Sequence, residues 1–405
     1  MNIPKFKKTL IDPDNKCEAC SVFDVNNDGI ADIVCGEYWY EGPAFDVKHK
    51  ICVITYDNEY VWDFCDYPMD VNGDGYTDII TGSWWDNGIY WRENPGANCG
   101  GADTAADADA AEWTTHKICD ATNVETIRFF DIDGDGMVEI FPNCPNEPVF
   151  YLKPAIDAQG RGTGQFEKYV LGESKAGHGI GFGDIDGDGL PEIIICGGIL
   201  HMPKGGLSGK PAALPAAGAT AWPWDFSPEL DIDFAASVPI LVHDMNGDGL
   251  PDLIVGSGHN YGLFWYEQQR SGGGSGGGSG GGDGSESGGS GARAWKRHVI
   301  DAAWSQYHDM QLIDIDGDGS LELLTGKRWR AHNGNDPGDS MPVFICYYDI
   351  DAERQTLYRH IIEYGDPQAG ATGAGIYFWT ADLTGNKKPD IVAPGKEGLY
   401  ILYNT

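Results

Sequence analysis

Short acidic segments recur through the sequence with the spacing of a cation-binding loop. The clearest copy, DIDGDGLPE at residues 184–192, follows the pattern D-x-[DN]-x-D-G-x-x-[DE]. Calcium prefers six to eight oxygen ligands, which a tight turn can gather from alternate side chains. The copy therefore predicts a structural Ca²⁺ site. Its expected ligands are the side chains of Asp184, Asp186, Asp188 and Glu192, with the carbonyl of Leu190.

Five more copies keep these offsets, so up to six Ca²⁺ sites are expected. The predicted ligands are Asp24, Asn26, Asp28 and Asp32; Asp70, Asn72, Asp74 and Asp78; Asp131, Asp133, Asp135 and Glu139; Asp244, Asn246, Asp248 and Asp252; and Asp314, Asp316, Asp318 and Glu322. The alternative is a set of metal-free turns, because Asp and Asn favour turns by themselves. Six near-identical, densely charged copies favour calcium. An EF-hand is excluded because strands are expected to flank each loop and no acid occupies its twelfth position.

A seventh copy departs from the pattern. It keeps Asp382 but has Thr384 and Asn386 at the next two ligand positions, followed by Lys387 and Lys388. With fewer acids and added positive charge, this copy predicts no Ca²⁺. A lysine is expected to compensate its remaining carboxylates.

The ten histidines fall into groups. His49, His116, His298 and His360 stand beside Lys or Arg in one recurring apolar segment and are interpreted as structural, and His243 adjoins an acidic loop. The other five lie just before or after the strands that flank three of the loops. Converging neutral imidazoles could bind Zn²⁺ or a similar divalent ion with an open coordination position. The alternative is a set of unrelated loop histidines. These five are His178, His201, His259, His308 and His332.

Further polar and aromatic residues lie near these histidines in the sequence. Proton abstraction next to a carboxylate needs a base, an acid and positive charge to stabilise the enolate. The predicted base is His308 or His259, the acid is Tyr261 or Tyr307, and the stabilising cations are Arg328 and Lys327. Aromatic rings could stack on sugars, although packing between structural units is the alternative for about half of them. The predicted substrate-binding residues are Tyr38, Trp62, Trp84, Trp222, Arg330 and Tyr377.

The acidic loops also define the fold that must position these groups. Each of the seven loops lies between two apolar strands, and copies follow one another at intervals of roughly 45 to 70 residues. Aromatic segments such as GLFWYEQ and basic segments such as WKRHVI supply a third and a fourth strand. This repetition predicts an all-β, seven-bladed β-propeller with four-stranded antiparallel blades. The chain begins in a fourth strand and ends in a third, so pairing of its two ends should close the ring.

The whole chain, residues 1–405, is expected to form one domain. Residues 271–292 are expected to form a flexible Gly/Ser loop within blade five. Residues 201–228 are expected to leave the second strand of blade four and are interpreted either as a lid or as a loop that only fills space. Because strands alternate in direction, the acidic loops should lie on one face of the disc and the five histidines on the other.

Composition limits the partners. The net charge of −35 argues against nucleic acid or an anionic membrane. No apolar run is long enough to span a bilayer. The N-terminal MNIPKFKKTLID lacks the apolar stretch of a secretory leader, which predicts a cytoplasmic protein with reduced thiols; secretion by another route stays open. The sequence leaves the oligomeric state open.

The acidic loops resemble the FG-GAP (VCBS-type) repeat over nearly the whole chain. That resemblance implies a seven-bladed propeller with structural Ca²⁺ in the loops. The segments YHDMQLIDIDGDG and GKRWRAHNGNDPG are similar to the propeller domain of aldos-2-ulose (anhydrofructose) dehydratases and, more loosely, to propeller polysaccharide lyases. No cupin-like second domain follows, which puts any isomerase step of the dehydratases in doubt.

Two functions follow as hypotheses. The first is a carbohydrate lyase or dehydratase that acts by proton abstraction and β-elimination. The second is a non-catalytic glycan-binding or adhesion propeller. The unequal distribution of histidines between blades favours one asymmetric site and therefore an enzyme. A Ser-His-Asp hydrolase is not supported, because no G-x-S-x-G motif occurs.

Overall fold

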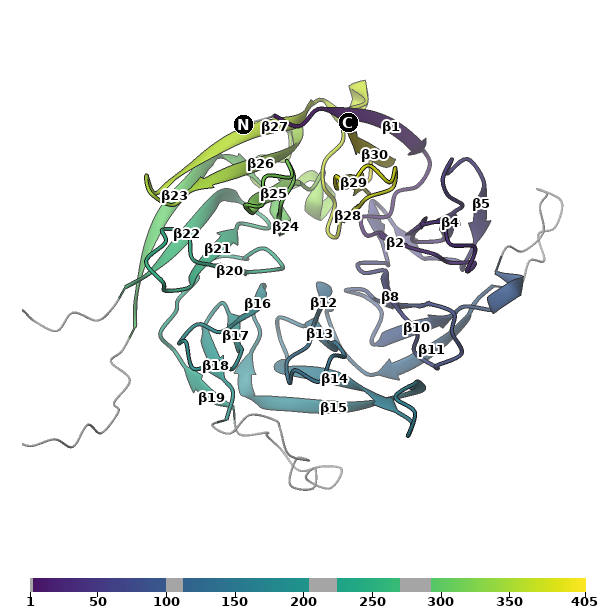
Figure 1. Ribbon diagram of the computed structural model, residues 1–405, viewed down its shortest axis with the longest axis horizontal. Helices are drawn as coiled ribbons and strands as arrows, with labels where there is room; N and C mark the ends of the chain where they lie inside the picture. The colour runs from purple at the N-terminus through teal and green to yellow at the C-terminus, as the bar shows by residue number, and fades with distance from the viewer. Residues whose placement is uncertain (1–2, 100–111, 204–223, 270–292) are drawn as a thin grey trace, which may run out of the picture.

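Seven four-stranded antiparallel sheets form a ring in the computed structural model of the protein. The structure describes residues 3–99, 112–203, 224–269 and 293–405. The first strand of each sheet lies nearest the common axis (Figure 1). The predicted Gly/Ser loop, Trp222 and residues 204–223 of the predicted lid lie outside the described residues. The fold is an all-β, seven-bladed propeller, as predicted.

The strands of the blades have the following bounds. Blade one contains β2 (Ser21–Phe23), β3 (Asp32–Cys35), β4 (Tyr38–Tyr40) and β5 (Lys48–Lys50). Blade two contains β8 (Tyr67–Met69), β9 (Asp78–Gly82), β10 (Ile89–Glu93) and β11 (Thr114–Cys119). Blade three contains β12 (Thr126–Phe130), β13 (Glu139–Asn143), β14 (Pro148–Ile156) and β15 (Gly162–Lys175). Blade four contains β16 (Ile180–Gly183), β17 (Glu192–Ile195), β18 (Gly198–His201) and β19 (Asp225–Ser227).

The remaining elements complete the ring. Blade five contains β20 (Leu241–His243), β21 (Asp252–Gly256), β22 (Tyr261–Gln269) and β23 (Ala294–Ser305). Blade six contains β24 (Tyr307–Ile313), β25 (Glu322–Lys327), β26 (Val343–Asp351) and β27 (Thr356–Gly365). Blade seven contains β28 (Trp379–Ala381), β29 (Asp390–Ala393), β30 (Leu399–Asn404) and the N-terminal β1 (Phe6–Asp12). Outside the blades lie the hairpin β6 (Tyr56–Asp57) and β7 (Tyr60–Val61), and the short 3-10 helices η1 (Gly96–Asn98), η2 (Ala331–Gly334) and η3 (Pro367–Ala369).

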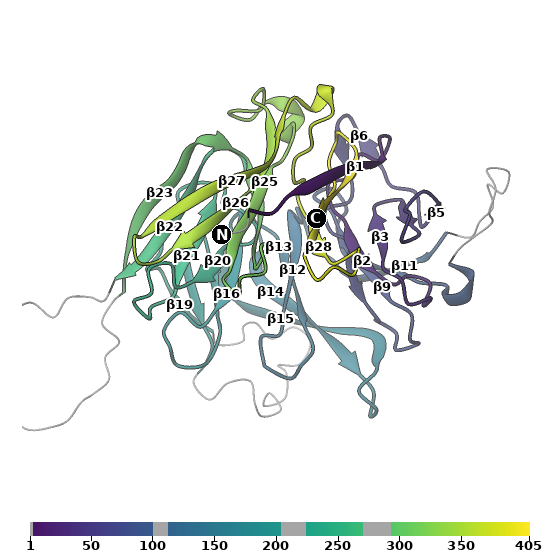
Figure 2. The ribbon, with the colours of Figure 1, turned by 45° about the horizontal axis from the view of Figure 1, so that its top comes forward.

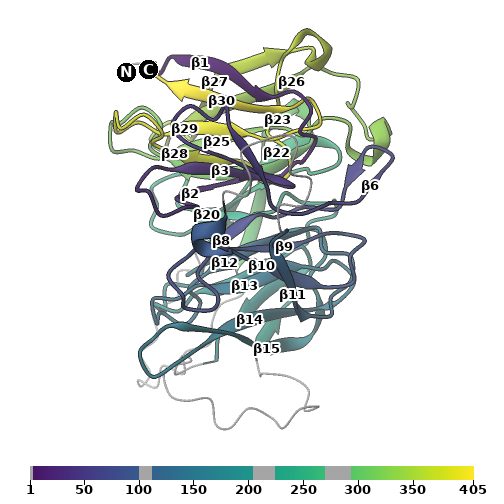
Figure 3. The same cartoon turned by 90° about the vertical axis from the view of Figure 1, so that its right-hand side faces the viewer.

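The two ends of the chain close the ring. Strand β1 pairs antiparallel with β30, with Phe6 opposite Asn404 and Leu10 opposite Tyr400. The chain ends therefore lie side by side (Figure 3). Closure of this kind removes the exposed sheet edge that an open array would leave. The predicted closure is confirmed.

Burial follows the position of a strand within its blade. The second strands, such as β9 and β21, are buried at every position because neighbouring blades cover both of their faces. The outermost strands alternate between exposed and covered residues, as β15 does. Strand β15 also pairs with β14 in a long hairpin that extends past the neighbouring blades (Figure 2). Its Gly164 amide donates to the carbonyl of Val71 at 2.8 Å, so the hairpin contacts the acidic loop of blade two.

Each acidic loop joins the first and second strands of its blade. In blade four, Asp184 accepts hydrogen bonds from the amides of Gly187 at 2.7 Å and Gly189 at 2.9 Å. Gly189 has a φ of 86°, a conformation that glycine adopts at low cost. The last acid, Glu192, is buried and accepts from the Ile185 amide at 2.7 Å. The loops are therefore tight turns with their acidic side chains gathered inward.

The assignment of blade four needs a correction. The prediction placed His201 and the segment up to residue 228 after the second strand. Instead β17 turns within residues 196–197 into β18, which runs back toward the acidic loop and ends at His201. The segment at 202–224 joins the third strand to the fourth, so it leaves β18 at the acidic-loop side. It does not start on the face where a lid over the other histidines would be needed.

Candidate functional site

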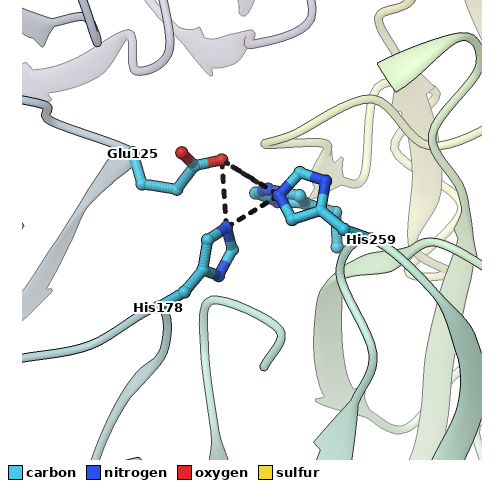
Figure 4. Close-up of side chains that lie close together, drawn as sticks. Glu125, His178 and His259 are labelled. Atoms are coloured by element: carbon cyan, nitrogen blue, oxygen red, sulfur yellow. Dashed lines mark hydrogen bonds and ion pairs between the residues drawn. The ribbon is translucent and has the colours of Figure 1, made fainter. Parts of the chain in front are cut away.

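Three predicted histidines and one glutamate that was not predicted meet near the axis of the ring, at the end opposite the acidic loops. Glu125 precedes β12, His178 precedes β16, His259 lies between β21 and β22, and His308 lies in β24. One oxygen or nitrogen atom from each lies within 4.8 Å of the others. Figure 4 shows Glu125, His178 and His259 pointing toward one another from three blades. We call these four residues the histidine–glutamate cluster.

Neighbouring acceptors fix the tautomers of two of the histidines. Nδ1 of His178 lies 2.7 Å from the Ala236 carbonyl, and Nδ1 of His259 lies 2.9 Å from Oδ2 of Asp336. Because a carbonyl and a carboxylate only accept, each Nδ1 carries the hydrogen and donates. Each neutral ring then has a lone pair on Nε2, and these two Nε2 atoms lie only 2.9 Å apart. Two facing lone pairs repel, so the arrangement requires a proton or a metal ion between them.

Glu125 supplies the negative charge of the cluster. Its Oε1 lies 2.9 Å from Nε2 of His308 and 3.2 Å from Nε2 of His178. Burial raises the pKa of Glu125, but His178, His259 and His308 outweigh burial and hold that pKa well below its usual value. Burial lowers the pKa of His308 to about 3 despite Glu125. An ionised carboxylate and neutral imidazoles are the forms that ligate divalent transition metals.

A second carboxylate supports the cluster from outside. Asp336 accepts from His259 and also from Nδ1 of His332 at 2.8 Å. Burial lowers the pKa of His259, but hydrogen bonds to Asp336 and Glu125 outweigh it and raise that pKa above its usual value. His332 is 55% exposed, with its ring centroid 4.4 Å from that of His259. Asp336 therefore orients one imidazole inside the cluster and one at its rim.

Buried ion pairs surround the cluster. Arg328 donates from two nitrogens to the carboxylate of Glu18 at 2.9 and 3.0 Å, and both residues are buried. Arg128 in β12 donates to Asp309 in β24 at 2.8 Å, which joins blade three to blade six across the axis. The Arg128 guanidinium also lies 4.2 Å from the centroid of the Tyr377 ring. These contacts fill the axis beside the cluster.

A pocket of about 130 Å³ adjoins Glu125 on the same face. Trp85 forms part of its wall and stacks on Trp62, with ring centroids 5.9 Å apart. The pocket therefore combines aromatic walls with a carboxylate, a guanidinium and an imidazole. Its lining residues are Tyr60, Phe64, Trp84, Trp85, Glu125, Arg328 and His332.

The structure brings four of the five predicted histidines together and leaves one apart. His178, His259 and His308 belong to the cluster and His332 lies at its rim. His201 lies instead beside the acidic loop of blade four, with Nδ1 3.4 Å from Oε1 of Glu192. The prediction for His201 was wrong because β18 carries it back to the loop face.

The other predicted catalytic residues differ in their surroundings, and of these only Arg328 is among the residues that line the pocket. Tyr307 is buried with its hydroxyl 3.3 Å from that of Tyr348, and the Tyr261 hydroxyl lies 3.4 Å from the sulfur of Met341. The Lys327 ammonium donates to three main-chain carbonyls between residues 338 and 341. Arg328 lines the pocket.

Among the predicted substrate-binding residues, Trp84 lines the pocket and Trp62 stacks behind it. Tyr377 is buried under Arg128, and the Tyr38 ring faces the Lys48 ammonium at 4.5 Å. Arg330 pairs with Glu59 through two contacts of 2.7 Å.

The prediction missed three groups: Glu125, Asp336 and Tyr60. Glu125 carried a signal in its spacing. His178 and His308 each stand six positions before the first Asp of their loops, Asp184 and Asp314, and Glu125 stands six positions before Asp131. Repeats of one structure place equivalent positions at one height around the axis. Glu125 could therefore have been predicted from its offset to the loop, although not from its residue type.

The acidic loops contain groups that could hold a metal ion. Side-chain oxygens of Asp131, Asp133 and Glu139 lie within 4.8 Å of one another, as do those of Asp184, Asp186 and Asp188. In the described residues these groups are separate from the histidine–glutamate cluster. The protein thus has candidate cation sites of two chemical kinds.

Comparisons with known proteins agree with this architecture. Residues 70–141, within blades two and three, match the FG-GAP-like repeat. No curated protein sequence matches the chain. Among the described residues, no helix is long and apolar enough to cross a membrane.

Solved structures are similar in fold. Two structures of BBS1N in complex with ARL6DN, one soaked with lead and one with mercury, have a TM-score of 0.50 and 11% sequence identity, and the match covers 99% of this chain and 96% of theirs. The V. cholerae biofilm matrix protein Bap1 gives a TM-score of 0.30 and 15% identity over 94% of this chain and 49% of that chain. At these identities the BBS1N match shows the propeller fold alone.

Proposed function

We propose that the protein binds a divalent transition metal ion at the histidine–glutamate cluster and uses this centre to bind a carbohydrate in the adjoining pocket. The observation that carries the proposal is the 2.9 Å approach of the Nε2 atoms of His178 and His259, which both have lone pairs when the two rings are neutral. A metal ion between them turns this repulsion into two coordinate bonds. Glu125 supplies one negative charge, and Nε2 of the third imidazole, His308, lies 2.9 Å from Oε1 of Glu125.

A carbohydrate is the ligand class that fits the pocket. The flat rings of Trp84 and Trp85 can stack on a sugar face, and Arg328 offers a fixed positive charge to an acidic sugar. The metal ion, when bound, would supply a Lewis acid for an oxygen of the ligand. An acidic sugar bound in the pocket would therefore contact the aromatic wall, the Arg328 guanidinium and the metal ion.

A solved structure with the same ring architecture gives an example of a propeller that binds a partner. BBS1N is described in complex with another protein, ARL6DN. We therefore place binding, here of a glycan, before catalysis. We also propose that acidic loops of the opposite face hold structural Ca²⁺.

Catalysis by β-elimination is the second candidate, and one observation favours it. His332 donates from Nδ1 to Asp336, which leaves the Nε2 lone pair of this exposed imidazole free, and His332 lines the same pocket as Tyr60. Such a carboxylate-oriented histidine is the usual form of a general base. In this mechanism His332 would take the proton beside the substrate carboxylate. Arg328 would stabilise the enolate, and Tyr60 would protonate the leaving oxygen.

Metal content tests the site. The purified protein should contain one transition metal ion per chain, and the double variant His178→Ala/His259→Ala should contain none. His360→Ala, which removes an outer-strand histidine, is the matched control and should keep the ion. Only calcium in the wild type would contradict the proposed centre.

Ligand assays separate the two candidates. Uronate-containing oligosaccharides should bind to the metal-loaded protein in calorimetry and should not bind to the double variant. Ultraviolet absorbance of an unsaturated product would establish the lyase, and its loss in His332→Ala with binding retained would identify the base. Binding without product across the panel would leave the glycan-binding function alone.

A further inference from the structure

One position, in the third strand of a blade or directly after it, lies opposite the last acid of the acidic loop. In blade two, Arg92 pairs with Ile79, so the register places the next residue, Glu93, opposite Asp78. In blade four, Leu200 pairs with Ile193, which places His201 opposite Glu192. We call this position the loop-facing position. From blade one to blade seven it is occupied by Glu41, Glu93, Lys153, His201, Glu267, Asp349 and Tyr403.

Blades one, two, five and six have an acid at the loop-facing position. A histidine of the outermost strand accompanies each acid. The contacts are His49 to Glu41 at 3.2 Å, His116 to Glu93 at 2.7 Å, His298 to Glu267 at 2.7 Å and His360 to Asp349 at 2.8 Å. Each imidazole also stacks on the aromatic ring two residues before its acid, with centroids 4.1 to 4.6 Å apart. The histidine therefore holds the acid in place.

In blade two the acid at this position contacts the loop itself. In blade two, the side-chain amide of Asn72 donates to Oε1 of Glu93 at 3.3 Å. Asn72 is the third residue of its loop, one of the positions that gather side chains toward the loop centre. A loop of this kind thus receives one more carboxylate than its own sequence contains.

Blade three has the opposite charge at the loop-facing position. The Lys153 ammonium donates to Asp133 and to Asp135, the latter at 2.7 Å, and lies 3.2 Å from Oε1 of Glu139. Asp133 and Glu139 belong to the set of oxygens close enough together to hold a metal ion. An amino-acid side chain therefore places its positive charge where the loop oxygens converge.

Blade four also has a protein cation next to its loop. Nε2 of His201 lies 3.0 Å from the Arg293 guanidinium, which can only donate, so the hydrogen of the imidazole is on Nδ1. That N–H points at Glu192 and at Asp186, 3.4 and 3.7 Å away. His201 thus offers a hydrogen rather than a lone pair to the loop, and Arg293 lies 3.8 Å from Asp186.

We infer that the loop-facing residue decides which cation each acidic loop takes. An acid there selects a divalent metal ion in blades one, two, five and six, and Lys153 serves as the built-in cation of blade three. Converging carboxylates repel one another unless a positive charge lies between them, and each further oxygen ligand increases the affinity for a calcium ion. An ammonium among the same oxygens supplies one charge and occupies the space of the ion. The inference rests on the proposed calcium binding and limits it to four loops.

Reciprocal substitutions test the inference. Calcium bound per chain is measured by equilibrium dialysis after removal of all metal by a chelator. Wild-type protein should bind four Ca²⁺. Lys153→Glu should bind one more, and the matched variant Glu93→Lys should bind one fewer. Because either charge reversal could impair folding, Lys153→Gln and Glu93→Gln are measured in parallel, and circular dichroism confirms the fold.

The outcomes separate this inference from the calcium proposal. Six ions in the wild type, or no additional ion in either folded Lys153 variant, would overturn the inference while calcium binding stood. No ion in the wild type but one in Lys153→Glu would overturn the calcium proposal and support the role of Lys153. No ion in any variant would overturn both.

Discussion

Asp336 accepts a hydrogen bond from Nδ1 of His259 at 2.9 Å, and this contact turns Nε2 of His259 toward His178. A carboxylate behind a metal-binding imidazole fixes the ring orientation and increases its basicity. Asp336 is therefore a positioning residue of the histidine–glutamate cluster, and it is supplied by the loop after β25, far from His259 in the sequence.

Replacement of Asp336 should weaken metal binding. We expect Asp336→Ala to lower the affinity for a transition metal by roughly 10- to 100-fold, because His259 loses its fixed tautomer. Competition with a chromogenic chelator measures the change. Asp157→Ala, which removes a partly exposed acid paired with Arg161, should leave the affinity unchanged. Equal affinities of Asp336→Ala and wild type would rule out the positioning role.

The pH dependence of metal binding follows from the raised pKa of His259. Burial lowers this pKa, but Asp336 and Glu125 outweigh burial, so in the metal-free protein His259 holds its proton to higher pH than a free imidazole. The proton competes with the metal ion, and affinity should fall about tenfold for each pH unit below the pKa. Asp336→Ala removes a partner that raises the pKa. Its affinity curve, measured from about pH 5 to about pH 8, should therefore shift to lower pH.

The sequence predicted the fold because the acidic loops mark every junction between first and second strands. It predicted part of the site for the same reason, because His178 and His308 keep a fixed offset from their loops. Glu125 keeps the same offset but was not predicted. The prediction for His201 was wrong because β17 and β18 are joined by a turn of only two residues, which the repeat pattern does not reveal. Asp336 comes from a loop and Tyr60 from the hairpin β6–β7, both outside the repeat, so their positions depend on tertiary contacts alone.

The ion pair across the axis should be important for stability. Asp309 is buried and its partner Arg128 has no other carboxylate in the contacts of the described residues. We expect Asp309→Ala to lower the free energy of unfolding by about 3–5 kcal/mol, because it leaves a buried guanidinium uncompensated. Asp351→Ala, which breaks an exposed pair with Arg354, should change stability by less than about 1 kcal/mol. Urea denaturation measures both. The double variant Arg128→Met/Asp309→Leu should recover much of the loss.

Removal of calcium should destabilise the ring. A ligand present at about 100 times its dissociation constant stabilises the folded state by about 2.7 kcal/mol per site. Several loops should add such contributions, so a calcium chelator should lower the thermal midpoint by many degrees. Added Ca²⁺ should restore the midpoint more effectively than Mg²⁺, which prefers a stricter octahedral geometry. A thermal midpoint that changes neither with the chelator nor with added Ca²⁺ would contradict calcium binding in the loops.

The aromatic wall of the pocket should control carbohydrate affinity independently of the metal ion. Trp85 contacts no residue of the histidine–glutamate cluster in its ring contacts, which are to Tyr60, Trp62 and Phe64. We expect Trp85→Ala to weaken binding of an acidic oligosaccharide by roughly 2- to 13-fold, as loss of one aromatic contact of about 0.5–1.5 kcal/mol would do, with metal content unchanged. Trp85→Phe should retain most of the affinity because it keeps a flat ring. Calorimetry and metal analysis on the same samples test both parts. Loss of metal together with the ligand would show that Trp85 supports the cluster rather than the sugar.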